Sequence, residues 1–556
     1  MEQGRLFLAI AISIAVFLLW ELVFVDRQAV QKPEEELQKA KIVEQKTTKE
    51  TPFNKTSEAV IPDQVLLKKD DVVGAPELPR TITVNSPLYR VQISEKGAVF
   101  KSFVLKDYRA RVEKDAPFKE LISKDLSGGT LRTGFAGNSL PGMKDALFQT
   151  AAEGETVDIF GRSEEISFSW ESPQGITVEK RFHFSAETYL IGLTVVIKNG
   201  SNQTFQDSLV LALVSTTPEK SRTYGFEGPS ALINNKLEQI KVKKIEEKSE
   251  YTGKIGWIAI EDRYFMSGII PKTSAEERMR LLLNPDNILE NQLVQPPSLI
   301  EPGTQQIYQY NLYLGPKSLK LLSKLGNDLD KAIYFGWFDF IAKPCLWFMN
   351  FLHGFIPNYG VAIIILTIFT KVLLWPLGSK SYKSMNEMKK VQPLMAEIRE
   401  KYKGDKKKMN EEIMGLYKTY KVNPMGGCLP MIVQIPVFFA LYRMLYEAIE
   451  LRHAPFLLWI TDLSAPDRLF RFDFSIPFMQ PPYGIPVLTL VMGATMLLQQ
   501  KMSPPPGDPA QAKMMMFMPI IFTFIFINFS SGLVLYWLTN NILSIGQQYY
   551  ISKKNA

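Results

Sequence analysis

Apolar segments of 16 to 26 residues, separated by charged or polar stretches, constrain the fold of this chain more than any other feature. A helix needs about 20 apolar residues to cross a hydrocarbon core roughly 30 Å thick. We therefore expect a multi-domain membrane protein whose α-helical core is an N-terminal anchor plus a five-helix bundle. The predicted spans are Leu6–Val25, Tyr359–Gly378, Pro424–Ile449, Gly484–Met502, Met514–Phe529 and Leu533–Ile551.

The first span allows two interpretations, a cleaved signal peptide or a retained anchor. Arg5 precedes the span, and no small-x-small cleavage site follows it between Glu21 and Val30. This pattern favours a transmembrane signal anchor over residues 1–27. Residues 28–77 are rich in Lys, Glu, Thr and Pro, a composition that does not bury a core, so we expect a disordered tether there.

Short alternating or β-branched runs fill residues 78–324. Examples are LYRVQIS, ITVEKRFHF, YLIGLTVVI and QIYQYNLYL, and Gly, Asn, Pro or Ser residues separate them. This spacing predicts a large antiparallel all-β domain built as a sandwich. Residues 325–356 follow as a linker and an aromatic-rich segment that Asp339, Lys343 and Pro344 interrupt. That segment is typical of an amphipathic helix lying in a membrane interface.

The distribution of basic residues predicts the orientation. Lysine and arginine outnumber acidic residues about two to one between Ser379 and Asn423, which places this loop in the cytoplasm. Counting spans from the loop places the β domain outside and both chain termini inside. The basic tail, residues 552–556, agrees with this orientation, which makes the β domain periplasmic in a Gram-negative inner membrane. The formal net charge of +7 is then explained by topology control and not by DNA binding.

The cytoplasmic loop, residues 379–423, has the periodicity of two helices. Apolar residues recur every three or four positions from Met385 to Tyr402, and again from Met409 to Tyr420. This pattern predicts an antiparallel helical hairpin. Its methionines would offer an adaptable surface to varied apolar partners, although packing between the two helices is the more common use of such a stripe. The methionines concerned are Met385, Met388, Met395, Met409 and Met414.

A lysine stands within the second span. Placing Lys371 in the hydrocarbon region costs about 2.5 to 3.5 kcal/mol, so its ammonium needs water, a partner or an escape route. Snorkelling along the roughly 10 Å to Gly378 is one explanation. A polar, water-filled groove is the other, because Thr367 lies one turn away on the same face and other spans add polar groups. Alternatively, these polar side chains only form hydrogen bonds between neighbouring helices and so stabilise the bundle. The additional residues are Gln434, Tyr536, Thr539 and Asn540.

This sequence lacks the motifs of several enzyme classes. It contains no G-x-x-x-x-G-K-[ST] phosphate loop, no G-x-S-x-G elbow and no H-E-x-x-H pair. Three histidines leave little for a histidine-based metal site, and the two cysteines, Cys345 and Cys428, lie outside the predicted β domain. We expect a protein that is not an enzyme and needs no cofactor or metal.

Three segments of the second half carry a resemblance to a known family. They are KVNPMGGCLPMIVQIPVFFALYRML, ELRHAPFLLWITDLSAPD and MMFMPIIFTFIFINFSSGLVLYWLTNNILSIGQQ. These segments closely resemble the YidC family of membrane protein insertases, and the likeness covers the whole chain in order. In the β domain, IGWIAIEDRYF and YNLYLGPK are weaker matches, but a large domain at this place marks the Gram-negative type.

The resemblance implies an insertase that helps integral inner-membrane proteins insert, fold and assemble, alone or with the Sec translocon. It implies a hydrophilic groove open to cytoplasm and lipid, and a hairpin whose methionines receive the client. Lys371 stands where the family usually has arginine, and Trp537 where tyrosine is frequent. The implied groove residues are Lys371, Thr367, Gln434, Tyr536, Trp537 and Asn540. The implied partners are nascent integral membrane proteins, Sec translocon components, membrane lipids and, as a further candidate, the ribosome.

The resemblance also implies a β-supersandwich fold for the periplasmic domain, like that of sugar mutarotases. His183 is the only histidine of that domain, which argues against sugar chemistry. A polytopic solute transporter is the alternative from another functional class. It predicts an inverted repeat with a site between broken helices, and five unequal core spans argue against it.

Overall fold

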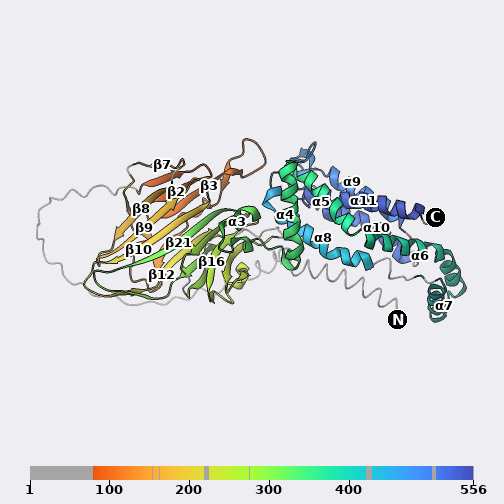
Figure 1. Cartoon of the computed structure of the whole chain (residues 1–556), viewed down its shortest axis with the longest axis horizontal. Coiled ribbons are helices and arrows are strands. Elements are labelled where there is room, and N and C mark those ends of the chain that lie inside the picture. Colours follow the sequence, from red (N-terminus) through yellow and green to blue (C-terminus); the bar gives the residue numbers. More distant parts are fainter. Residues whose placement is uncertain are drawn as a thin grey trace, which may run out of the picture. The chain divides into compact units, whose positions relative to one another are not determined.

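The computed structural model describes residues 79–152, 154–161, 163–217, 225–273, 276–420, 422, 429–503 and 509–554 (Figure 1). The predicted anchor, residues 1–27, and the predicted tether, residues 28–77, lie outside this range. Strands fill the first part of the described chain and helices the last part, and Arg80–Thr217 and Glu227–Ala556 belong to one compact unit. The prediction of an all-β domain followed by a helical bundle is confirmed.

A nine-stranded antiparallel sheet is the largest element of the β domain, in the order β14-β13-β16-β17-β21-β10-β9-β8-β6. The alternation in ITVEKRFHF places every second side chain of β9 in the core, as a half-buried strand requires. The strands are β6 (Gln149–Thr150), β8 (Glu164–Glu171), β9 (Ile176–Phe184), β10 (Leu190–Asn199), β13 (Gly228–Ile233), β14 (Lys236–Gln239), β16 (Ile255–Glu261), β17 (Phe265–Pro271) and β21 (Gln305–Pro316).

Two five-stranded sheets accompany it, and a two-stranded sheet pairs β11 (Phe205–Asp207) with β20 (Ser298–Ile300). The first, β4-β3-β2-β1-β7, comprises β1 (Thr81–Asn85), β2 (Tyr89–Ser94), β3 (Val99–Arg109), β4 (Phe118–Glu120) and β7 (Thr156–Asp158). The second, β15-β18-β19-β12-β5, comprises β5 (Arg132–Phe135), β12 (Leu209–Thr216), β15 (Glu250–Thr252), β18 (Arg278–Leu283) and β19 (Ile288–Val294). The β1–β7 pair is parallel, so the expected antiparallel pattern has this exception.

The helical part centres on one long helix, α11 (Ser531–Lys554), which contacts α5, α6, α8 and α9. The other helices are α3 (Leu319–Leu325), α4 (Asp339–Phe355), α5 (Tyr359–Leu373), α6 (Trp375–Lys401), α7 (Lys406–Thr419), α8 (Leu429–Glu447), α9 (Val487–Met502) and α10 (Pro509–Phe526). The aromatic-rich segment forms α4, whose side chains Trp347, Phe351 and Phe355 are exposed.

The second predicted span, 359–378, is shorter in the structure. Its helix α5 ends at Leu373, and α6 begins at Trp375 after a bend of 65°. Pro376 explains the break, because proline lacks the N–H that would continue the hydrogen-bonding pattern but suits the first turn of a new helix. Among the described residues, α5 and α6 together meet the length and hydropathy expected of a membrane span, whereas no unbroken helix does.

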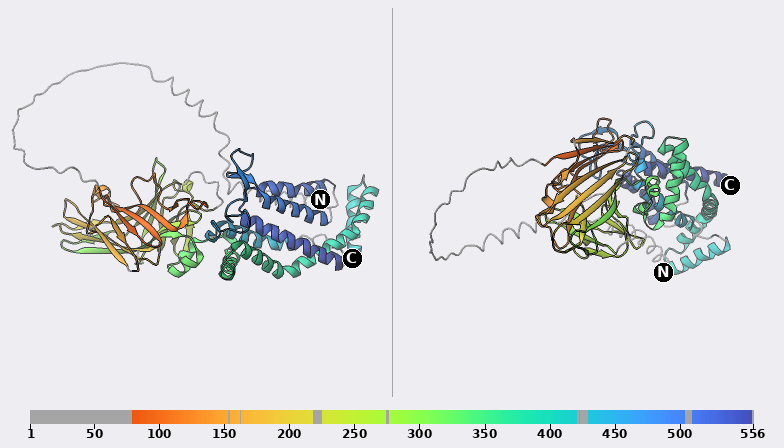
Figure 2. Two further views of the ribbon diagram at one scale, coloured as in Figure 1. Left: turned by 90° about the horizontal axis from the view of Figure 1, so that it is seen from above. Right: turned by 60° about the vertical axis from the view of Figure 1, so that its left-hand side comes forward.

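A small antiparallel pair, β22 (Leu469–Phe472) and β23 (Tyr483–Ile485), lies between α8 and α9. The periodicity of the sequence does not predict it, because each strand is short and the segment between them contains prolines. In the left view of Figure 2 this hairpin is the pair of blue strands at one end of the blue helices.

Candidate functional site

The ammonium of Lys371 lies between two helices. Lys371 stands in the last turn of α5, where the helix dipole favours a positive charge. Its Nζ donates to Ser544 Oγ at 2.7 Å and to Asn540 Oδ1 at 3.5 Å, both on α11. The half-buried lysine therefore has hydrogen-bond partners inside the bundle, which snorkelling to the helix end would not require.

Asn540 connects this lysine to a third helix. Gln434 of α8 donates from Nε2 to the same Asn540 Oδ1 at 3.4 Å. The structure thus brings Lys371, Gln434 and Asn540 together from three helices, and all three are partly accessible. The two contacts to Asn540 are long, so the Lys371–Ser544 bond is the strongest of the cluster. We call Lys371, Gln434, Asn540 and Ser544 the polar cluster.

The remaining groove candidates make other contacts. Thr367 is buried, and its hydroxyl donates to the carbonyl of Ile363 in its own helix at 2.6 Å. Tyr536 is also buried. Trp537 belongs to an aromatic group, with ring centroids 4.7 Å from Phe438 and 4.5 Å from Phe526. The assignment of Thr367, Tyr536 and Trp537 to a client groove stays a prediction.

Sequence reasoning missed several polar residues on α11. Ser544 lies one turn beyond Asn540, and Gln547 lies one turn further on the same face. Gln547 donates to the carbonyl of Trp375 at 3.1 Å, close to the break between α5 and α6. Asn541 donates to Thr495 of α9 at 3.3 Å. The sequence signal for Ser544 and Gln547 is their spacing of four and seven residues from Asn540, whereas Asn541 lies directly beside it.

The predicted cytoplasmic hairpin corresponds to α7 and the later part of α6. Its core consists of Val391, Met395, Ile413 and Val422. Met388 and Met409 pack against this core, so three of the five predicted client-binding methionines lie in the contact between the helices. Met385 is half-buried, and Met414 is the exposed member of the set. Packing between helices is the common use of such a methionine stripe, and most of these methionines are used in this way.

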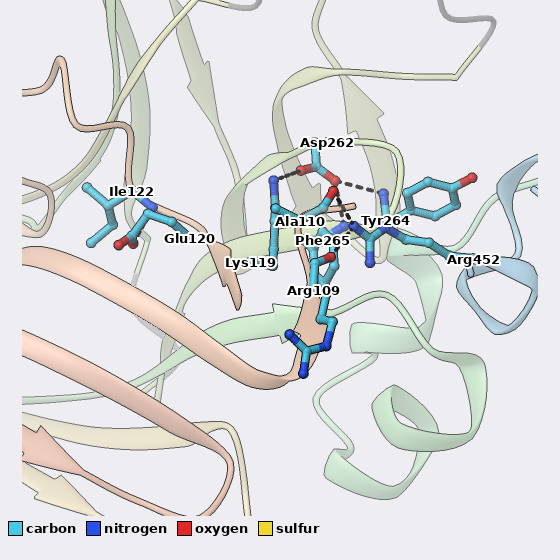
Figure 3. A network of polar contacts seen from close by, with 9 residues as sticks. All are labelled: Arg109, Ala110, Lys119, Glu120, Ile122, Asp262, Tyr264, Phe265 and Arg452. Carbon is cyan, nitrogen blue, oxygen red and sulfur yellow. Dashed lines mark hydrogen bonds and ion pairs between the residues drawn. The ribbon is translucent and has the colours of Figure 1, made fainter. Parts of the chain in front are cut away.

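A second group of polar contacts connects the β domain with the chain after α8 (Figure 3). Arg452 donates to the carbonyl of Arg109 at 2.6 Å, and its guanidinium lies 5.4 Å from the centre of the Phe265 ring. Lys119 pairs with Asp262 at 3.7 Å beside it. Arg263 donates to the carbonyl of Tyr446 near the C-terminal end of α8. Carbonyls there lack helical partners, so the arginine satisfies one of them.

These features define a class of protein: a helical bundle with a partly accessible polar cluster between its helices, joined to an all-β domain. The family described as 60Kd inner membrane protein matches residues 351–556, and the YidC periplasmic domain matches residues 81–348. "Membrane protein insertase YidC" of Syntrophobacter fumaroxidans is 40% identical over 99% of this chain and 100% of its own length. That of Geobacter sulfurreducens is 42% identical over 84% of this chain and 85% of its own.

The chain belongs to the YidC family of membrane protein insertases, inner-membrane proteins with a periplasmic domain. A crystal structure of an active YidC insertase with its first transmembrane domain resolved is 19% identical, with a TM-score of 0.37, and covers 85% of this chain and 92% of that one. A putative aldose 1-epimerase from Escherichia coli K12 covers 43% of this chain and 99% of that one, with 8% identity and a TM-score of 0.31. The relatives' names denote insertases, not enzymes, and they do not support the solute transporter alternative.

Proposed function

We propose that this protein inserts nascent integral membrane proteins into a Gram-negative inner membrane, with the polar cluster lining a groove open to cytoplasm and lipid. The observation that carries the proposal is the set of hydrogen bonds that joins Lys371 to Asn540 and Ser544, and Asn540 to Gln434. Lys371, Gln434 and Asn540 are partly accessible, Ser544 is buried, and α11 carries further polar side chains at Asn541 and Gln547. Both chain termini and the α6–α7 hairpin are cytoplasmic in this proposal, and the β domain is periplasmic.

The polar cluster would lower the barrier to moving a hydrophilic segment. A client span gains up to about 0.6 kcal/mol for each of its most apolar residues on entering lipid, so insertion is favourable once it begins. The obstacle is the polar flank, because charged groups in hydrocarbon are costly. A hydrated groove that reaches Lys371 shortens the apolar path. The ammonium there attracts acidic residues of the flank, and the process consumes no nucleotide.

The α6–α7 hairpin would receive the client before it reaches the groove. Three methionines are committed to the contact between the helices, so the exposed Met414 and the basic outer surface remain to meet a client, the ribosome or anionic lipid. The Sec translocon is a further proposed partner. The α6–α7 hairpin has its own apolar core, so its fold does not depend on contact with the translocon.

Purified full-length protein in liposomes, supplied with a small single-span client, tests the proposal. With wild type, we expect the client's flank to enter the liposome and so become inaccessible to external protease. Lys371→Arg should retain most of this insertion. Lys371→Glu should lose it when the flank is acidic, because like charges repel. Lys501→Ala is the matched control, since Lys501 stands in the last turn of α9 and is exposed. Full insertion by Lys371→Glu would show that the positive charge of Lys371 has no role in insertion. Inactivity of the wild type would refute the insertase proposal.

A further inference from the structure

The loops between α8 and α9 expose large apolar side chains. Leu458 is 88% exposed, Phe478 87%, Phe470 73% and Phe474 65%. Single exposed apolar residues are common, but four such residues within 21 positions are a concentration typical of an interaction surface. We call these four residues the apolar rim.

A fixed framework holds the apolar rim. Arg468 is buried and donates to the carbonyl of Pro482 at 2.9 Å and to that of Ile527 at 2.8 Å. Asp467 accepts hydrogen bonds from the Trp459 indole and from the backbone N–H of Leu488, the second residue of α9. Hydrogen bonds from Arg468 and Asp467 therefore fix the backbone that carries the exposed side chains to the start of α9 and to the residue after α10.

The rim continues the exposed apolar surface of α10. Asn528, two residues beyond the end of that helix, donates to the carbonyl of Phe478 at 2.7 Å and accepts from the N–H of Gln480 at 2.8 Å. The last turns of α10 expose Ile521 and Phe524. Phe478 is thereby fixed beside the end of a helix whose outer side chains are apolar.

Helix length provides a second argument. α9 has 16 residues and α10 has 18, which gives about 24 Å and 27 Å at 1.5 Å per residue. A hydrocarbon core is about 30 Å thick, so α9 falls short of it by about 6 Å and α10 by about 3 Å. Apolar and aromatic side chains near the end of α10 and the start of α9 would lengthen the apolar surface there.

We propose that the apolar rim inserts into the headgroup and upper acyl region of the outer leaflet, so its partner is the lipid bilayer itself. Phe and Leu side chains bury themselves at the boundary between headgroups and acyl chains. Arg471 beside them is half-exposed and pairs with Glu113 at 3.6 Å, so no part of the inference depends on its charge. The inference rests on the proposed membrane arrangement, which puts the end of α10 on the periplasmic side. Lipid is favoured over a protein partner because Phe478 is held beside the end of α10, whose exposed apolar side chains would face acyl chains.

The test uses full-length protein in liposomes, with Cys345 and Cys428 changed to serine and one cysteine introduced for an environment-sensitive fluorophore. The rim probe is Phe478→Cys. Phe524→Cys on α10 reports the bilayer, and Asn202→Cys, at an exposed turn of the β domain, reports water. We expect the Phe478 probe to show blue-shifted emission relative to the Asn202 probe. We also expect nitroxide-labelled lipids to quench it more strongly than aqueous iodide does.

Three other outcomes would overturn the inference in distinguishable ways. Iodide quenching at Phe478 together with lipid quenching at Phe524 would leave the membrane arrangement intact and place the rim in water. Protection of the Phe478 probe from both quenchers would indicate a covering protein, such as a second copy of this chain. Absence of lipid quenching at Phe524 as well would refute the membrane arrangement itself, and the inference with it.

Discussion

Lys180 is a second lysine withdrawn from water, and its surroundings differ from those of Lys371. It lies in β9 inside the β domain, where its Nζ donates to the carbonyl of Gly97 at 2.7 Å and lies 5.1 Å from the centre of the Phe148 ring. A carbonyl and a ring face stabilise a cation less than water does, so burial lowers the pKa of Lys180 to about 7.

This depressed pKa predicts a stability that rises with pH. Between about 7 and the ordinary value of 10.5, the unfolded chain binds a proton at Lys180 and the folded chain does not. Raising the pH through this window therefore stabilises the folded β domain by roughly 1.4 kcal/mol per unit, and the effect is absent below it. Lys180→Met should flatten this dependence in thermal unfolding of the full chain followed by circular dichroism. An unchanged slope would exclude the lysine as its source, and exposed Lys198→Met serves as the control.

Asn540 is the residue that connects Lys371 with Gln434, because its side-chain oxygen accepts from both. Asn540→Leu keeps the size but removes the acceptor, and because the contacts to Lys371 and Gln434 are long, at 3.5 Å and 3.4 Å, their loss costs no more than about 1 kcal/mol each. We expect a several-fold slower insertion of a client with an acidic flank in the liposome assay. Exposed Ile542→Ala on the same helix should leave the rate unchanged. Equal rates for all three proteins would assign Asn540 to packing alone.

At the scale of elements, the α6–α7 hairpin offers two adjacent positions with opposite environments. Ile413 is buried in the hairpin core, whereas Met414 is 40% exposed. An aspartate at 413 loses the apolar contacts, worth about 2 to 5 kcal/mol, and buries a charge without a partner.

Limited proteolysis of the full chain would measure the result. Ile413→Asp should make the hairpin much more sensitive to protease, and Met414→Asp should leave it resistant. If Met414→Asp keeps the hairpin intact but reduces crosslinking to a client, the exposed methionine has the receiving role proposed for it. Equal resistance of both variants would show that the core at Ile413 does not hold the helices together.

At the scale of the whole molecule, a buried ion pair lies where the β domain leads into the helices. Lys317 Nζ lies 3.0 Å from Glu261 Oε2, and both side chains are almost completely buried. The next residue, Ser318, donates to Glu450 Oε1 at 3.3 Å, and Asn350 of α4 approaches the same oxygen at 3.5 Å. Segments far apart in the sequence are thus joined by charged and polar groups away from water.

Breaking this pair from one side should be costly. Lys317→Met leaves the Glu261 carboxylate buried and unpaired, which destabilises by about 3 to 5 kcal/mol. The double variant Glu261→Gln and Lys317→Met should recover part of that loss, because the unpaired charge is gone. Denaturant unfolding of the full chain gives the values for Lys317→Met, for Glu261→Gln and for the double variant. A double variant as unstable as the sum of the two single changes would mean that the residues act independently.

The sequence by itself determined the division into an all-β part and an apolar helical part, because alternation and long apolar runs are local properties of the chain. β9 illustrates the first, since its side chains alternate between core and surface, and α11 the second, since it contains the apolar run Leu533–Ile551. It also pointed to Lys371, because a lysine in an apolar run is conspicuous without any structure.

Tertiary structure decided which partners these side chains have. Ser544 became the nearest partner of Lys371 only through the packing of α5 against α11, and most hairpin methionines were drawn into a helix contact. Hydrogen bonding between Asn528 and the carbonyl of Phe478 placed this exposed aromatic residue beside the end of α10, which the sequence does not show. Periodicity reports which face of an element is apolar, but only the packed fold fixes what that face meets.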